Sequence, residues 1–250
     1  MEMVASFAAT SLIALIHILV GHRAFKPREG SAWLSAAGGA SVAYVFIYVL
    51  PKLARKQEQV DEHIGFGVLS YLEHHVYLVA MIGLIFYHSI HRIAEFATVQ
   101  RTGNKTDHAN LAAILHIGSF LLYGFIIGHL FASFLQKTYM PLTLASVTFA
   151  LHFIGTDLEL KHKYQAFYAD RVRWLLVASL YVGWLVGELT VVPVSTEILL
   201  FSFLAGAIII NVMREEIPQE TQIQTLAFLG GAVAYAILVL FAFEYVFELI

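Results

Sequence analysis

Apolar stretches long enough to cross a bilayer follow one another along almost the whole of this chain. A membrane-spanning helix needs roughly 20 predominantly apolar residues. Eight segments of about this length are present: 3–20, 33–51, 72–92, 109–135, 139–160, 173–192, 196–213 and 223–248. Because little sequence lies outside them, we predict an all-α fold over residues 1–250. It is a single transmembrane domain, a polytopic bundle of eight helices whose main partner is the lipid bilayer.

Composition supports this class and excludes several functions. Only 13% of the residues are charged, against about 25% in a soluble domain. A net charge of −3 argues against nucleic acid as a partner. The chain has no cysteine, which excludes thiolate metal sites and iron–sulfur clusters. The serine patterns of membrane and α/β hydrolases, Ser-x-x-Lys and Gly-x-Ser-x-Gly, are also absent, so we expect a protein that is not an enzyme.

Basic residues sort to one side of an eight-span topology. Loops after the odd-numbered spans, with the adjoining helix ends, contain eleven of the fifteen Lys and Arg residues, and the other side contains Lys52, Arg55, Lys56 and Lys137. Positive charge favours the cytoplasmic side. We therefore expect both chain ends to be extracytoplasmic, in a multi-pass protein of a bacterial-type plasma membrane.

The fifth and sixth spans contain ionisable side chains that are costly in hydrocarbon and usually functional. His152, Thr156 and Glu159 recur at i, i+4 and i+7, on one helix face. Asp157 lies about 140° around the same helix from His152, and Glu188 is deep in the sixth span. Imidazole with carboxylate suits a zinc-like or iron-like divalent ion. We predict His152, Asp157 and Glu188 as metal ligands.

The fourth span offers a second polar face. His116, Ser119 and Tyr123 follow at i, i+3 and i+7. Hydroxyl groups bind transition ions less well than imidazole or carboxylate. We therefore predict these three residues, with Thr156 and Glu159, as the lining of a transport pathway rather than as the main ligands.

The second and seventh spans resemble those of the ZIP family of divalent-metal transporters. The second has Gly38-Gly39 and ends in Leu50-Pro51, and the seventh has Leu204-Ala205-Gly206 followed by Glu215-Glu216-Ile217-Pro218. The resemblance implies eight spans, both ends outside, and passage of zinc, iron or manganese by alternating access, with a homodimer left open.

The resemblance also marks where this chain departs from the family. The family's fourth-span histidine, asparagine and carboxylate fall on Ser119, Phe120 and Tyr123. In the fifth span His152 matches the leading histidine, Thr156 replaces a ligand, and Asp157 supplies a carboxylate at the next position.

Two other functions remain open at this point. His75 with His129, and His88 with His116, are spaced so that two antiparallel helices would hold two bis-histidine haems for electron transfer. Alternatively, the missing fourth-span ligands fit a ZIP-shaped protein that no longer carries metal and serves as a sensor, a partner subunit or a carrier of another solute.

Overall fold

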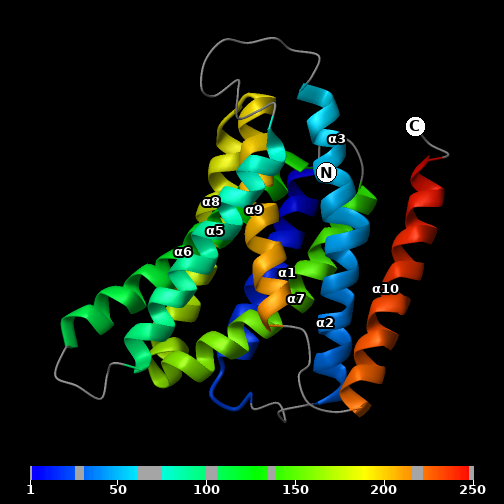
Figure 1. The fold of residues 1–250 in the computed structure, drawn as a ribbon. Coiled ribbons are helices and arrows are strands. Elements are labelled where there is room, and N and C mark those ends of the chain that lie inside the picture. Colours follow the sequence, from blue (N-terminus) through cyan, green and yellow to red (C-terminus); the bar gives the residue numbers. More distant parts are fainter. Residues whose placement is uncertain are drawn as a thin grey trace.

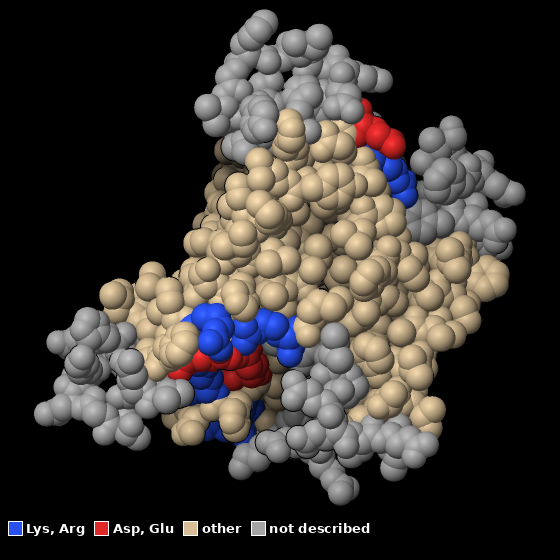
Figure 2. Space-filling view, viewed as in Figure 1, with Lys and Arg blue, Asp and Glu red and all other residues tan. Residues whose placement is uncertain are grey.

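The computed structural model describes residues 2–25, 31–60, 75–99, 106–134, 139–215 and 222–247. Within these ranges every regular element is a helix, and seven stretches are long and apolar enough to cross a membrane. On the face in Figure 2, charged side chains gather toward the two ends, and a broad band between them is tan. The fold is therefore a polytopic helical bundle of the membrane type.

The first half of the bundle consists of α1 (Glu2–Gly21), α2 (Ala32–Tyr44), α3 (Leu50–Val60) and α5 (Val76–Val99). A π-helical turn, Val45–Val49, joins α2 to α3 without a break. Pro51 explains it, because a proline has no N–H and its ring clashes with the carbonyl of residue i−4, here Ile47. The second predicted span thus extends nine residues beyond its predicted end at 51.

The second half consists of α6 (Thr106–Phe134), α7 (Tyr139–Phe167), α8 (Arg173–Leu189), α9 (Val194–Glu215) and α10 (Gln222–Phe247). Where we predicted two spans, 139–160 and 173–192, one stretch of 48 residues, Leu142–Leu189, is apolar enough to cross a membrane. Gln165, with φ 47°, interrupts the helical backbone, and a π-helical segment, Tyr168–Val172, follows. The chain turns at this point in Figure 1, and both α7 and α8 pack against α1.

Glycines bring three helix pairs into backbone contact. A methyl group on Gly39 of α2 would lie 1.9 Å from the Phe228 carbonyl oxygen of α10, and one on Gly231 of α10 would lie 2.0 Å from the Ala36 carbonyl oxygen of α2. Each helix therefore presents a glycine to the backbone of the other. The pairs α5–α9 and α6–α8 are built in the same reciprocal way, by Gly83 with Gly206 and by Gly128 with Gly183. Small residues at helix contacts are the expected device in lipid, where apolar surface alone gives no drive to associate.

The helix pairs show an internal correspondence between two sets of spans. Numbering α7 and α8 as fifth and sixth, the pairs second–eighth (α2–α10) and seventh–third (α9–α5) correspond, as do fourth–sixth (α6–α8) and fifth–first (α7–α1). The first, second and third helices thus correspond to the sixth, seventh and eighth in the same order, and the fourth corresponds to the fifth. The start of α1 and the end of α10 lie toward the same end of the bundle, and α10 forms one edge beside α2 (Figure 1).

The glycine contacts make a direct prediction on α10. Gly231→Ala should destabilise the protein by about 1–3 kcal/mol, because the new methyl group overlaps the α2 backbone. Gly230→Ala is the matched control, since a methyl group there meets nothing within 4 Å, and alanine favours a helix. Thermal unfolding of the two purified variants in detergent measures the difference; equal midpoints would contradict the packing described here.

Candidate functional site

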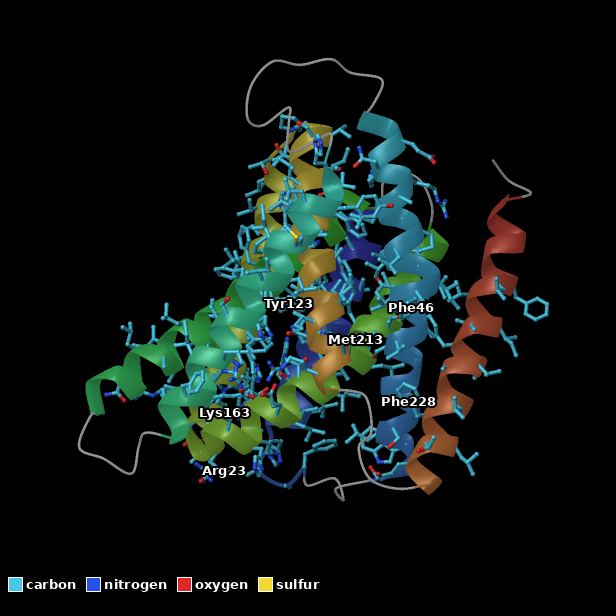
Figure 3. The ribbon with its side chains drawn as sticks, viewed as in Figure 1. Arg23, Phe46, Tyr123, Lys163, Met213 and Phe228 are labelled. Carbon is cyan, nitrogen blue, oxygen red and sulfur yellow. The ribbon has the colours of Figure 1, made fainter. Side chains whose placement is uncertain are left out.

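Two predicted polar faces meet inside the bundle. His116, Ser119 and Tyr123 of α6 are all buried, as are His152 and Thr156 of α7, while Glu159 is half-buried. The Tyr123 and His152 rings have centroids 6.0 Å apart, and one ligand atom of His116 lies within 4.8 Å of one of Glu159. Figure 3 shows Tyr123 in the middle of the bundle. We call these residues the polar file: His116, Ser119, Tyr123, His152, Thr156 and Glu159.

The polar file runs along a seam between two helices whose backbones are not closely packed. α6 packs tightly against α8, α8 against α1, and α1 against α7, but α6 and α7 are not among the closely packed pairs. Side chains therefore bridge this seam instead of backbones. The two levels of the polar file, Tyr123 with His152 and His116 with Glu159, are seven residues apart on each helix, which is roughly 10 Å of helix rise.

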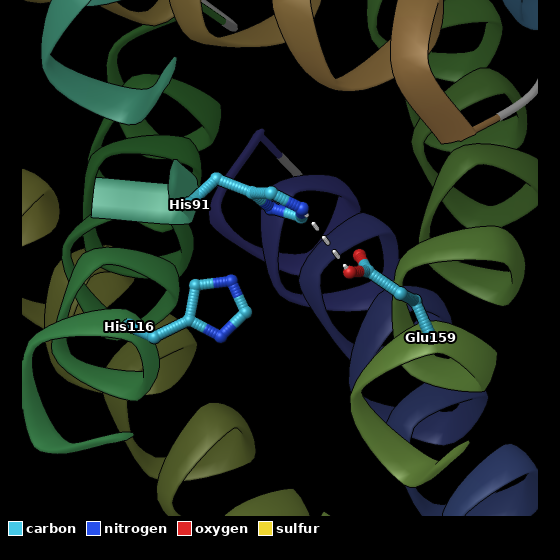
Figure 4. Close-up of side chains that lie close together, drawn as sticks. All are labelled: His91, His116 and Glu159. Atoms are coloured by element: carbon cyan, nitrogen blue, oxygen red, sulfur yellow. Dashed lines mark ion pairs between the residues drawn. The ribbon is translucent and has the colours of Figure 1, made fainter. Parts of the chain in front are cut away.

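One end of the polar file is a cluster of three possible metal ligands. His91 of α5, His116 of α6 and Glu159 of α7 each offer one atom, and these atoms all lie within 4.8 Å of one another. His91 Nε2 is 3.6 Å from Glu159 Oε1, and Figure 4 shows the three side chains converging from three helices. His116 Nε2 and Glu159 Oε2 are buried and have no hydrogen-bond partner. Imidazole and carboxylate groups so arranged are typical ligands of divalent transition ions.

Neighbouring side chains hold this cluster in place. His116 Nδ1 is 2.8 Å from the Tyr164 hydroxyl. The Tyr87 hydroxyl of α5 donates to the Ser119 carbonyl of α6 at 2.9 Å, which ties the two helices together. His91 Nε2 also lies 3.3 Å from Glu95 Oε1. The same oxygen accepts a hydrogen bond of 2.8 Å from Arg214 Nη2 of α9.

Asp157 faces the opposite side of α7, toward α1. Its carboxylate accepts a hydrogen bond from His17 Nδ1, with distances of 2.8 and 2.9 Å to its two oxygens. The two side chains are 0% and 1% exposed. One turn further, Lys161 Nζ donates to the carbonyls of Val20, His22 and Phe25 at the end of α1. The predicted ligand Asp157 is therefore engaged in the seam between α1 and α7.

Glu188 lies at the other end of α1. Its Oε1 accepts a hydrogen bond of 2.8 Å from Ser6 Oγ, and Trp184 Nε1 donates to the same hydroxyl at 2.9 Å. Ser6 and His17 are eleven residues apart on α1, which is roughly 16 Å of helix rise. The structure thus places Glu188 and Asp157 at different levels of α1 and does not bring them together with His152.

The two haem pairs are not formed either. His88 is exposed on α5, whereas His116 is buried and packs its ring against His91, with centroids 5.2 Å apart. His75 is exposed just before α5 begins. His129 is buried and stacks on Phe125 of its own helix. Each predicted pair therefore joins an exposed histidine to a buried one.

Sequence reasoning missed His91 and His17. The predicted third span ends at 92, which leaves His91 at its edge, whereas α5 continues to Val99. His91 is one helical turn from His88, and an apolar pattern on every face does not say which histidine of that helix points inward. Predicting the role of His17 requires knowledge that α1 packs on α7, and no local sequence pattern contains this information.

An apolar hollow lies beyond the polar file along the same two helices. It is small, about 10 Å³, and its lining has no ionisable group other than a tyrosine: Tyr44, Ile127, Leu130, Phe131, Ala145, Phe149, Phe201 and Leu204. α6 contributes residues later than Tyr123 and α7 residues earlier than His152, so the hollow is next to the polar file and outside it.

Comparison with known proteins does not place the chain in a family. A scan against protein-family models finds no match, and a search of the curated proteins finds none either. The likeness to ZIP transporters accordingly rests on the residues quoted above.

The buried His17–Asp157 pair yields a stability prediction. Asp157→Ala should cost about 3–5 kcal/mol, because it leaves His17 buried without its partner. The double substitution His17→Gln with Asp157→Asn should recover much of this loss, since an amide pair can restore the hydrogen bond. Asp170→Ala, which breaks the exposed pair with Arg23, is the control and should cost about 1 kcal/mol or less. Chemical unfolding in detergent gives the comparison, and similar losses for Asp157→Ala and Asp170→Ala would contradict it.

Proposed function

We propose that this protein is an integral membrane transporter of divalent metal cations, with the polar file as its pathway. One observation carries the proposal: imidazole, hydroxyl and carboxylate groups from α6 and α7 face one another inside an apolar bundle. Ionisable groups at this depth are costly, and in membrane proteins they mark ion pathways. Their chemistry selects the class of solute, because imidazole with carboxylate binds zinc, iron or manganese in preference to magnesium or calcium.

We further propose that the chain crosses the membrane eight times, with both ends outside. The interruption at Gln165 and the separate packing of α7 and α8 against α1 support counting Leu142–Leu189 as two crossings. With eight crossings, the His91 end of the polar file faces the cytoplasm. Lys163 and Arg23 lie toward that end of the bundle in Figure 3, in agreement with the positive-inside rule.

Alternating access follows from the same arrangement. A unit of three spans that recurs with the opposite direction of crossing is typical of transporters built from inverted repeats. The pairs α2–α10 and α5–α9 are locked by glycines, whereas the seam between α6 and α7 is bridged by side chains. Rocking of helix groups that opens this seam at one end and then at the other would expose the polar file to each side in turn.

Uptake by proteoliposomes tests the proposal. The reconstituted protein should take up Zn²⁺ or Mn²⁺, and His152→Leu should lower the initial rate at least about tenfold because it removes the only imidazole at its level of the polar file. His129→Leu is the matched control, since it removes a buried imidazole of α6 that stacks on Phe125. Its uptake should stay near that of the unmodified protein.

Two outcomes would count against the proposal. If His129→Leu lowers uptake as much as His152→Leu, the polar file is not the pathway. If neither Zn²⁺, Mn²⁺ nor Fe²⁺ enters the vesicles, transport of this ion class is excluded, and the alternative of a sensor, partner subunit or carrier of another solute is favoured.

A further inference from the structure

We propose that His91, His116 and Glu159 form a binding site for a zinc-like divalent cation at the cytoplasmic end of the polar file. The assignment of that end to the cytoplasm rests on the proposed function. The site itself does not, because it is argued from the geometry of three side chains. It is distinct from the predicted ligand set His152, Asp157 and Glu188, and it includes a residue of α5.

The spacing of the three side chains is close to what such an ion requires. Metal–ligand distances of about 2.0–2.2 Å in a tetrahedral site place neighbouring ligand atoms roughly 3.3–3.5 Å apart. His91 Nε2 and Glu159 Oε1 are already 3.6 Å apart, and all three ligand atoms lie within 4.8 Å of one another. Small side-chain rotations therefore close the site without movement of the helices.

The protonation pattern of His116 suits a ligand. When its Nδ1 carries the hydrogen and donates it to the Tyr164 hydroxyl at 2.8 Å, the lone pair of Nε2 is available, and this is the buried atom without a partner. Metal-binding histidines commonly donate their other ring N–H to a neighbouring oxygen, which fixes the ring orientation. Tyr164 is therefore a positioning residue of the site.

Two imidazoles and one carboxylate leave one coordination position open. This ligand set matches exchangeable zinc sites, whereas structural zinc sites are closed by four protein ligands. Glu95 lies next to one of the ligands, with Oε1 3.3 Å from His91 Nε2, and it is held by Arg214 and Arg92. A solvent-accessible carboxylate at 38% exposure can take over the ion on its way to water.

The surrounding positive charges favour release of the ion from this site. Lys163 and Arg214 both act electrostatically on the His91 and His116 pair. Nearby positive charge weakens the binding of a divalent cation. A transport site must bind its ion strongly enough to receive it and weakly enough to release it. The positive charges of Lys163 and Arg214 therefore favour a site from which the ion leaves over a permanent metal site.

Cobalt binding by the purified protein tests the site without requiring transport. Co²⁺ titrated into the protein in detergent should give a visible absorption band of a low-coordinate site, and Zn²⁺ should abolish it by competition. His91→Ala, His116→Ala and Glu159→Gln should each weaken Co²⁺ binding at least about tenfold. His88→Ala removes an exposed histidine one turn away on the same helix and should leave binding unchanged. Binding that survives all three substitutions would overturn the site.

A gain-of-affinity variant separates a ligand site from a merely structural cluster. Lys163→Gln removes a positive charge near the two histidines, and Zn²⁺ should bind about tenfold more tightly as a result. A variant that failed to fold would not gain affinity, so an increase cannot arise from damage. Unchanged Zn²⁺ affinity in a folded Lys163→Gln protein would contradict the location of the ion.

Uptake measurements on the same variants distinguish failure of the site from failure of the function. Uptake by the unmodified protein that persists in His91→Ala would remove this site from the pathway and leave transport intact. Co²⁺ binding that depends on the three residues, in a protein that takes up no ion, would keep the site and exclude transport.

Discussion

Backbone contact at glycines determines where everything else in this bundle can lie. Gly39 with Gly231 and Gly83 with Gly206 bring two helix pairs together so closely that no side chain fits between their backbones. In lipid such contacts supply much of the attraction between helices. Helices joined in this way leave no room for a polar lining. The seam between α6 and α7 lacks this contact, and the polar file lies along it.

α7 has two polar faces, and each contacts a different neighbouring helix. Asp157 and Lys161 attach it to α1 through buried and half-buried hydrogen bonds, whereas Glu159 turns toward α6 and the two histidines. Two residues of sequence thus separate a carboxylate that holds the fold from one that is open to a ligand. The difference between them is the helical angle alone, and so is the difference between the exposed His88 and the buried His91.

Periodicity predicted the elements of this fold and the faces of its polar file, but not its pairings. The spacing of His116, Ser119 and Tyr123, and that of His152, Thr156 and Glu159, each define one helix face, and the two faces meet. The spacing within one helix does not contain the choice of neighbour. For that reason the sequence groups Asp157 with Glu188, although Asp157 pairs with His17, and it does not single out His91. A span whose lipid-facing side is also apolar carries little information about which side faces inward.

The apolar hollow has an electrical consequence for the membrane. Apart from the Tyr44 hydroxyl, its lining of aromatic and aliphatic side chains offers nothing to replace the water around an ion, and a small cavity of this character stays dry. In this conformation the half of the seam that contains Phe131 and Phe149 therefore acts as an insulator. A sodium or potassium ion in this half of the seam would therefore have to keep its own water, or stay outside.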